Sequence, residues 1–288
     1  MARARKLDTN VPGNFYVNDQ CINCDTCRQL APDTFAEVGD YSAVVQQPVN
    51  EAERRQANHA LLACPTAAIV SESKEGLPVA MGDFPLNIHE NVYYVGYTSP
   101  KSYGGSSYLV VHPDGNWLVD APRFVPQLAT KLEKMGGIRY IFLTHRDDVA
   151  DADKYASHFS AERIIHVLEK NAQPDAEHLI EGDDAIDWQP DFRFIPVPGH
   201  TKGHMALLYR QAYLFSGDHL AWDRETDSLT AFEDYCWYSW EKQLQSLGRL
   251  LNERFEWVLP GHGDRIHLKE ARMRAEMKAM LSRFTKLP

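Results

Sequence analysis

The stretch Ile138–Asp151 reads IRYIFLTHRDDVAD, and it joins an apolar half to a polar half. The run Tyr140–Leu143 is apolar, aromatic and β-branched, which is typical of a strand buried on both faces, although so short a run also occurs in buried helices. The polar half carries one histidine, His145, and three carboxylates. Side chains just beyond the carboxyl end of a buried strand are held by the sheet yet remain accessible, so polar groups there are candidates for function.

The same arrangement recurs three times further along the chain. Each of three apolar runs leads into a loop, mostly rich in glycine or proline, that carries a histidine or an aspartate: Phe194–Pro198 before His200, Ala212–Phe215 before Asp218, and Trp257–Leu259 before His262. Imidazole and carboxylate groups are metal ligands. Four such strand ends therefore predict a metal site.

The order His145, Gly199-His200-Thr201, Gly217-Asp218 and Gly261-His262-Gly263 resembles the metallo-β-lactamase superfamily, over roughly residues 85–288. The resemblance implies an αβ/βα sandwich of two packed sheets, with helices outside and metals at one edge. The first motif departs from the family pattern His-x-His-x-Asp-His. The matching positions here are His145, Asp147, Val149 and Ala150, so three of the four are changed.

By this resemblance, His145, Asp147 and His200 face one metal, His262 faces a second with Val149 and Ala150 beside it, and Asp218 bridges the two. Valine and alanine side chains cannot bind a metal, so we do not expect a stable two-metal site unless Asp148 or Asp151 substitutes. The predicted metal ligands are His145, Asp147, His200, Asp218 and His262, and the predicted catalytic carboxylates are Asp218 and Asp148.

The first metal position retains two histidines and one carboxylate. His145, His200 and Asp218 match the facial arrangement of non-haem Fe(II) enzymes, and the persulfide dioxygenases of the superfamily look similar. We expect one iron or zinc ion here, with Asp147 as a fourth ligand or as a group that orients His145. The alternative is an empty site in which the polar side chains bond to each other. His204 and His219 are expected to pack around the ligands.

Four of the five cysteines lie in the first 64 residues. Cys21, Cys24 and Cys27 are spaced Cys-x-x-Cys-x-x-Cys, and Cys64-Pro65 follows after 36 intervening residues. Three thiolates in one tight loop with a distant fourth fit an iron–sulfur cluster, and the segment resembles a single-cluster bacterial-type ferredoxin. We predict one 4Fe-4S cluster. A zinc site, which usually uses two separated cysteine pairs, structural thiols and a three-iron cluster are the alternatives.

Length and composition fit two domains of a globular protein. The chain has 288 residues, and we predict an α+β protein: a ferredoxin-like domain over 1–80, a polar linker over 71–84 and the lactamase-like sandwich over 85–288.

The net charge of −10 argues against nucleic-acid partners and anionic membranes. No apolar run is long enough for a membrane span, and the basic start has no apolar segment after it, so a cytoplasmic protein is expected.

The pairing of the two domains indicates redox chemistry, because zinc does not change oxidation state. We therefore predict that the cluster exchanges electrons with a mononuclear iron. A redox partner protein or a small-molecule donor supplies these electrons, and the substrate is expected to be a small molecule. The alternatives are a metallo-hydrolase with a structural or regulatory cluster and an electron carrier or redox sensor with an inactive second domain. Cys236 is expected to be a buried apolar group or, alternatively, a thiol relay at the site rim.

Overall fold

The computed structural model describes residues 4–285, and the chain divides into two compact units. Unit 1 runs to Asn116 and also includes Pro122–Gly137. Unit 2 consists of Trp117–Ala121 and the chain from Ile138 onward. The cysteine motif therefore lies in unit 1. All the predicted ligands of the histidine and aspartate metal site lie in unit 2.

The first part of unit 1 is a small α+β core. It contains two antiparallel strand pairs and two helices: β1 (Phe15–Val17) with β4 (Ile69–Ser71), β2 (Phe35–Val38) with β3 (Tyr41–Val44), α1 (Thr26–Leu30) and α2 (Glu51–Ala63). The β2–β3 turn uses Gly39 at a positive φ of 64°, which costs glycine little. Helix α2 begins at Asn50, whose side chain accepts a hydrogen bond from the Glu53 N–H at 2.9 Å.

The segment expected to be a linker contains a helix. Helix α3 (Leu77–Asp83) begins after Gly76, which lies at φ 74°, and has proline in its first turn. Its last residue, Asp83, accepts hydrogen bonds from Arg55 and from His59 of α2. The polar and Gly/Pro-rich composition of residues 71–84 therefore reflects helix termini and an ion pair, and the segment predicted as a linker includes a short helix.

The rest of unit 1 is antiparallel. Strands β5 (Leu86–His89), β6 (Val92–Tyr94) and β7 (Tyr108–Val110) pair in sequence order. The short helix η1 (Pro100–Ser102) lies between β6 and β7, and α4 (Pro126–Lys134) follows in the second stretch of the unit. Residues 98–105 and Arg123 thus belong to the same compact unit as the cysteines.

Unit 2 contains two sheets that pack face to face. The first consists of parallel strands β8 (Trp117–Val119), β9 (Tyr140–Phe142), β10 (Glu162–His166) and β11 (His178–Ile180). The second has the order β12 (Ile186–Gln189), β13 (Phe192–Pro196), β14 (Met205–Tyr209), β15 (Tyr213–Gly217), β18 (Trp257–Pro260) and β19 (Ile266–His267). Trp117 stacks on Phe192 with ring centres 4.2 Å apart, and Phe142 contacts Phe194 at 4.9 Å. These aromatic pairs hold the sheets together.

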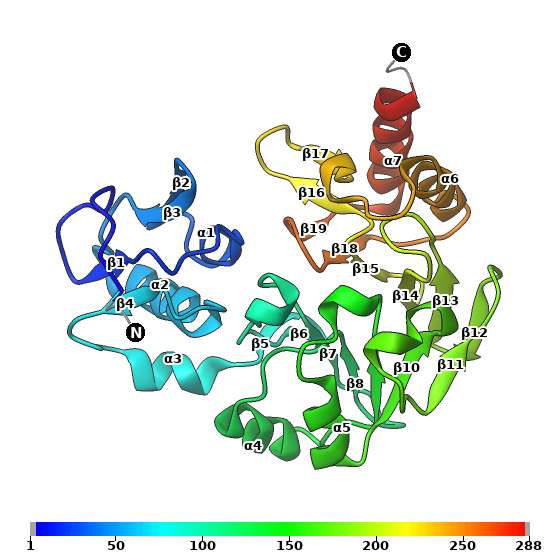
Figure 1. Cartoon of the computed structure of the whole chain (residues 1–288), viewed down its shortest axis with the longest axis horizontal. Helices are drawn as coiled ribbons and strands as arrows, with labels where there is room; N and C mark the ends of the chain where they lie inside the picture. The colour runs from blue at the N-terminus through cyan, green and yellow to red at the C-terminus, as the bar shows by residue number, and fades with distance from the viewer. Residues whose placement is uncertain (1–3, 286–288) are drawn as a thin grey trace. The chain divides into compact units, whose positions relative to one another are not determined.

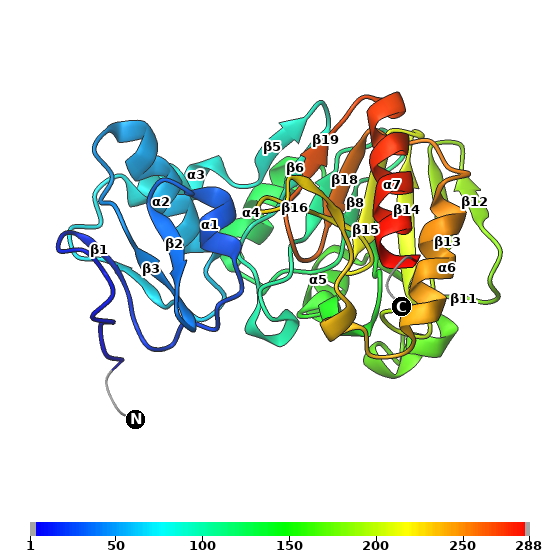
Figure 2. The same cartoon turned by 90° about the horizontal axis from the view of Figure 1, so that it is seen from above.

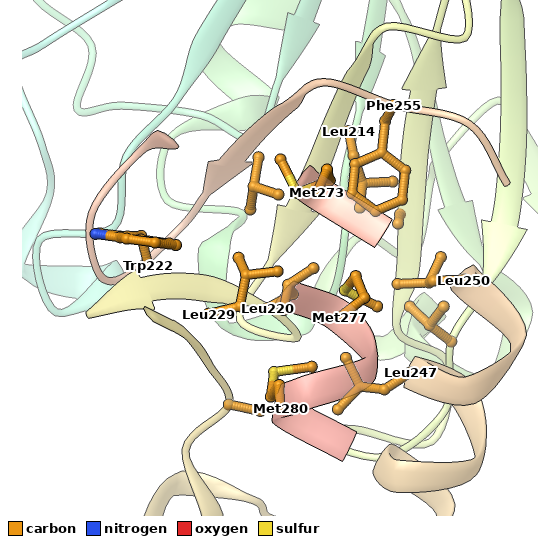
Figure 3. Close-up of a cluster of buried hydrophobic side chains, with 14 of the residues drawn as sticks. Leu214, Leu220, Trp222, Leu229, Leu247, Leu250, Phe255, Met273, Met277 and Met280 are labelled. Carbon is orange, nitrogen blue, oxygen red and sulfur yellow. The ribbon is translucent and has the colours of Figure 1, made fainter. Parts of the chain in front are cut away.

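Helices α6 (Trp240–Leu250) and α7 (Glu270–Thr285) lie side by side over the outer face of the second sheet (Figures 1 and 2). Figure 3 shows Met273, Met277 and Met280 of α7 among Leu247 and Leu250 of α6 and apolar side chains of the sheet. The spacing of the three methionines places them on one face of α7. Each such buried side chain stabilises the fold by about 1.5–3 kcal/mol.

The remaining elements of unit 2 are short: α5 (Ala152–Phe159), β16 (Ala221–Asp223), β17 (Ser228–Thr230) and the 3-10 turns η2 (Arg146–Asp148), η3 (Val167–Ala172) and η4 (Glu233–Tyr235). Among residues 4–285, no helix is both long enough and apolar enough to cross a membrane.

Candidate metal and cluster sites

The four predicted strand-end loops of unit 2 converge. His145 follows β9, His200 follows β13, Asp218 follows β15 and His262 follows β18. Strands β13 and β15 are both antiparallel to β14, and β18 is parallel to β15, so their carboxyl ends share one edge of the second sheet. This topology brings together side chains that are far apart in the sequence.

One carboxylate oxygen lies at the centre of the group. Oδ2 of Asp218 is 3.6 Å from Nε2 of His145, 3.6 Å from Nε2 of His200 and 3.9 Å from Nε2 of His262. Oδ2 of Asp147 is 3.8 Å from Nε2 of His145 and 3.6 Å from Nε2 of His200. Two ligands that are each about 2.1 Å from one ion lie roughly 3–3.5 Å apart. Small shifts would therefore let these groups surround one metal.

The ligand atoms themselves lack other partners. Nε2 of His145, Nε2 of His200 and Oδ1 of Asp218 are buried and, in the described part of the chain, make no hydrogen bond. Buried polar atoms are normally hydrogen-bonded, so two unbonded histidine nitrogens that both lie 3.6 Å from Oδ2 of Asp218 fit a metal ion well. The alternative prediction of a hydrogen-bonded polar cluster is not supported for these atoms.

Asp148 joins this group, whereas Asp151 does not. His145, Asp148 and Asp218 form a second set of mutually close ligand atoms beside the set of His145, Asp147 and His200. Asp148 is 2% exposed, and its Oδ2 has no hydrogen-bond partner among the described residues. Asp151 forms an ion pair with Lys154 at 3.2 Å. Of the two carboxylates that could replace the missing family ligands, only Asp148 lies with the other ligands.

Glycine at position 261 makes the approach of the two carboxylates feasible. A Cβ atom there would lie 2.5 Å from Oδ1 of Asp218 and 2.6 Å from Oδ2 of Asp148, which is too close for carbon. The Gly-His-Gly motif therefore supplies His262 and also leaves room for both oxygens.

A chain of hydrogen bonds orients His145, and the sequence reading did not identify it. Asp120, at the end of β8, accepts hydrogen bonds from the N–H of Thr144 at 2.8 Å and from its hydroxyl. The same hydroxyl lies 3.0 Å from Nδ1 of His145. If that hydroxyl donates to Asp120, it accepts the Nδ1 proton of His145 and leaves Nε2 free to bind a metal. Asp120 follows an apolar strand, as His145 and Asp218 do, so the same pattern in the sequence could have identified it.

Two further histidines pack against the ligands. The ring of His204 stacks on His145 with centres 4.8 Å apart, and its Nε2 accepts the N–H of Asp218 at 3.2 Å. His219 lies 5.6 Å from His204, measured between ring centres. Burial, together with the neighbouring histidines, lowers the pKa of His204 well below its usual range, and burial lowers the pKa of His219 to about 3. Both rings are therefore neutral, as expected for packing groups.

The net pKa shifts of the buried carboxylates have opposite directions. Burial alone would raise the pKa of Asp218, but His262, His145 and His200 outweigh it and hold that pKa far below its usual range. Burial raises the pKa of Asp148 well above normal, with the nearby Asp218 charge adding to the shift, and burial raises the pKa of Asp120 to about 7. The hydrogen bond from His200 likewise lowers the pKa of Asp147. Asp218 and Asp147 are thus the carboxylates that stay ionised and available as ligands.

An aromatic loop borders His200. The backbone N–H groups of Trp237 and Tyr238 donate to the His200 carbonyl at 3.0 and 3.1 Å. Trp237 and Tyr238 are largely exposed. The thiol of Cys236 donates to the Gly199 carbonyl at 3.2 Å and is partly exposed. Cys236 is therefore not fully buried, and its predicted roles remain predictions.

The four cysteines of unit 1 line one cavity. Cys21, Cys24, Cys27 and Cys64 face it together with Ile22, Thr26, Ser42, Pro65 and other small or apolar residues. Burial raises the pKa of the Cys24 thiol to about 11 and that of Cys27 to about 12. Buried thiols lose their protons only when positive charge lies beside them. The iron ions of a cluster supply that charge.

The backbone around this cavity also fits a cluster. The N–H of Asn23 donates to Sγ of Cys21 at 3.4 Å, and the N–H of Ala68 donates to Sγ of Cys64 at 3.3 Å. The hydroxyl of Thr26 lies 3.4 Å from Sγ of Cys24. Hydrogen bonds to sulfur stabilise thiolate ligands and tune cluster potentials.

Comparison with protein families gives two matches. Residues 17–71 match the model of the 4Fe-4S single cluster domain of Ferredoxin I, and residues 92–281 match the model of the metallo-beta-lactamase superfamily. The predicted order of the two families and the α+β fold class are confirmed.

Among curated proteins, the chain is 25% identical over 160 residues to a Beta-lactamase-like protein 2 homolog of Drosophila melanogaster, covering 50% of this chain and 52% of that one. It is 30% identical over 76 residues to a Hydroxyacylglutathione hydrolase of Xanthomonas campestris pv. campestris, covering 26% of this chain and 29% of that one. The chain thus spans about half, or less, of the length of these relatives.

Solved structures share the fold. The DIM-1 metallo-beta-lactamase aligns with a TM-score of 0.51 at 15% identity, over 69% of this chain and 96% of that one. A metallo-beta-lactamase family protein from Thermus thermophilus aligns with a TM-score of 0.50 at 17% identity, over 68% and 79%. Since the superfamily model matches well over half of the chain, this protein belongs to the metallo-beta-lactamase superfamily and carries a single-cluster 4Fe-4S ferredoxin domain ahead of the lactamase-like part.

Proposed function

We propose that this protein is a redox protein in which a 4Fe-4S cluster exchanges electrons with a mononuclear non-haem iron held in unit 2. Cys21, Cys24, Cys27 and Cys64 hold the cluster, and His145, His200 and Asp218 hold the iron. When bound, the cluster supplies single electrons and the iron changes oxidation state by one unit. The electrons come from a redox partner protein or a small-molecule donor.

The observation that carries this proposal is the convergence of two histidines on one aspartate oxygen. His145 and His200 each place Nε2 3.6 Å from Oδ2 of Asp218. Two histidines and one carboxylate leave open positions on an iron ion. Asp147 is half-exposed, and its Oδ2 lies within 3.8 Å of Nε2 of both histidines, so it can complete the coordination or orient an incoming small molecule.

The residues at the ligand positions of the family's second metal support a mononuclear site. Val149 and Ala150 occupy two of the four positions of the family motif and offer no ligand atom. A zinc-only site would also leave the electrons of the cluster without an acceptor in this chain, because zinc has no redox chemistry.

The second candidate function is metal-dependent hydrolysis, and Asp148 favours it. This buried carboxylate belongs with His145 and Asp218 to a second group of close ligand atoms. Together with His262, whose Nε2 lies 3.9 Å from Oδ2 of Asp218, it offers ligands for a second ion. A short stretch of the chain is also similar to the Hydroxyacylglutathione hydrolase. In this case the cluster is structural or regulatory, and a metal-bound hydroxide is the nucleophile.

Anaerobic metal analysis with Mössbauer spectroscopy on the full chain separates these functions. The redox proposal expects about four cluster irons and one further mononuclear iron. The matched control is the double variant His200→Ala/Asp218→Ala, which should lose only the mononuclear iron. Zinc in place of that iron would support the hydrolase. Four cluster irons and no other metal would support an electron carrier with an inactive second site.

A further inference from the structure

An arginine from the lactamase-like part of the sequence is bonded to the fourth cysteine of the ferredoxin part. Arg123 lies outside residues 17–71 but within unit 1. Its Nη1 donates to the carbonyl of Cys64 at 2.9 Å and to that of Pro65 at 3.2 Å, and its Nη2 donates to the carbonyl of Leu62 at 2.8 Å. The guanidinium also lies 5.9 Å from the ring centre of Tyr97.

These carbonyls are at the carboxyl end of α2, where helix carbonyls lack partners within the helix. The carbonyl of Ala63, between those of Leu62 and Cys64 in the chain, accepts a hydrogen bond from the hydroxyl of Thr98 at 2.7 Å. Two side chains from outside the ferredoxin match therefore satisfy four successive carbonyls at the turn that carries Cys64. The partial negative charge at this helix end is offset by the positive charge of Arg123.

The same segment of unit 1 also contacts the three-cysteine loop. A Cβ atom at Gly104 would lie 2.7 Å from Cβ and 2.8 Å from Sγ of Cys24, so the Gly104 backbone lies directly against this cysteine. The hydroxyl of Thr26 donates to the Gly104 carbonyl at 3.2 Å. The hydroxyl of Tyr103 donates to the Ile22 carbonyl at 2.5 Å.

We propose that residues 98–105 and Arg123, here named the cluster cover, set the reduction potential of the cluster and shield it from dioxygen. Residues that match the lactamase superfamily thus complete the electron-carrying site of the ferredoxin domain. The proposal rests on cluster binding by the four cysteines, but it is independent of which metal unit 2 binds and of any electron transfer to it.

The direction of the electrostatic effect follows from charge. Reduction adds one negative charge to the cluster, and the Arg123 cation beside the Cys64 turn favours the reduced form. Replacing this cation by a neutral side chain should make reduction less favourable. Solvent and protein screen the interaction, so we expect about a tenfold change in the reduction equilibrium, which is about 59 mV for one electron.

The test is redox titration of the full-length, cluster-loaded protein, followed by electron paramagnetic resonance. Arg123→Met should lower the potential by about that amount, and Arg123→Lys should restore most of the loss because the charge returns. Arg54→Met is the matched control, because Arg54 is a cation of α2 itself but pairs with Glu75 near the surface. An unchanged potential in Arg123→Met, or an equal shift in Arg54→Met, would overturn the tuning role.

Shielding has its own measurement, which does not depend on the arginine variants. Gly104 lies at φ 87°, and an alanine there would both strain the backbone and displace the cover from Cys24. Gly104→Ala should therefore bleach several-fold faster in air than the wild-type protein. Gly82→Ala is the control, since its Cβ would meet nothing within 4 Å and its φ is ordinary. Equal bleaching of Gly104→Ala and the wild type would overturn the shielding role.

Discussion

Nε2 of His145 lies 3.6 Å from Oδ2 of Asp218, although the two residues follow different sheets of unit 2. His145 follows β9 of the first sheet, and Asp218 follows β15 of the second. The pair therefore connects the two layers of the sandwich at one edge. A metal bound by both residues would also connect the layers.

The first prediction concerns the ligands. In the full chain, Asp218→Ala and His200→Ala should each abolish tight metal binding in unit 2 and leave the cluster intact. His262→Ala should weaken binding less, because its neighbours at the second position are Val149 and Ala150. The measurement is metal content by plasma mass spectrometry after gel filtration. Two tightly bound ions in the wild-type unit 2 would instead make Asp148 a ligand.

The second prediction concerns the orientation of His145. Thr144→Val keeps the side-chain shape but removes the hydroxyl that lies between Asp120 and Nδ1 of His145. Metal affinity in unit 2 should fall about 10–100-fold, as is usual when a group that orients a ligand is lost. Competition with a chelator measures the affinity. Thr230→Val, which removes a hydroxyl outside this chain of hydrogen bonds, should bind metal like the wild type.

The third prediction concerns the cluster. Cys21→Ser, Cys24→Ser, Cys27→Ser and Cys64→Ser should each reduce visible absorbance, iron and sulfide in anaerobically purified protein. Cys236→Ser, whose thiol lies in unit 2 and bonds to the Gly199 carbonyl, is the matched control and should keep all three. A colourless wild-type protein with one zinc on the four thiols would contradict the assignment.

The fourth prediction concerns pH and the α2–α3 pair. The hydrogen bond from Arg55, with help from His59, lowers the pKa of Asp83 from 3.8 to about 2. A carboxyl group with a lowered folded-state pKa contributes stability above its unfolded pKa, and this contribution is lost as the pH falls toward the folded pKa. Asp83→Asn should therefore be less stable than the wild type by about 1 kcal/mol at neutral pH, a modest value because the pair is near solvent.

Urea unfolding at a series of pH values measures this difference. The gap between Asp83→Asn and the wild type should be constant above about pH 5 and should close between about pH 4 and pH 2. A gap that persists unchanged at low pH would show that the ion pair is not its source.

The sequence predicted the strands of the site because their signals are local. The short apolar runs Tyr140–Leu143, Ala212–Phe215 and Trp257–Leu259 end at polar loops, and the structure has strands at all three, within a residue or two of these bounds. The Cys-x-x-Cys-x-x-Cys spacing is also a local signal, because it places three thiols in one tight loop. Helix α3 was missed because it has only seven residues, of which Ala80 alone is buried, and because Asp83 pairs with α2 through a tertiary contact.

The parts of the site that depend on tertiary contacts were less accessible. The sequence offered Asp148 and Asp151 as equal substitutes, and only the fold places Asp148 beside Asp218. Likewise, the contact of Arg123 with the Cys64 turn joins residues 59 positions apart. No spacing rule connects an arginine after β8 to a cysteine after α2, so this contact could not be predicted from the sequence.

The most direct test of the redox proposal is electron transfer within one molecule. The full chain, loaded with ferric iron in unit 2, is reduced at the cluster by a brief anaerobic pulse of reductant, and the oxidation states are followed by rapid-freeze Mössbauer spectroscopy. The account predicts that ferric iron bound by His145, His200 and Asp218 becomes ferrous at a rate independent of protein concentration, and that in Cys24→Ser it stays ferric. Equal reduction in Cys24→Ser, or binding of zinc alone in unit 2, would contradict the account.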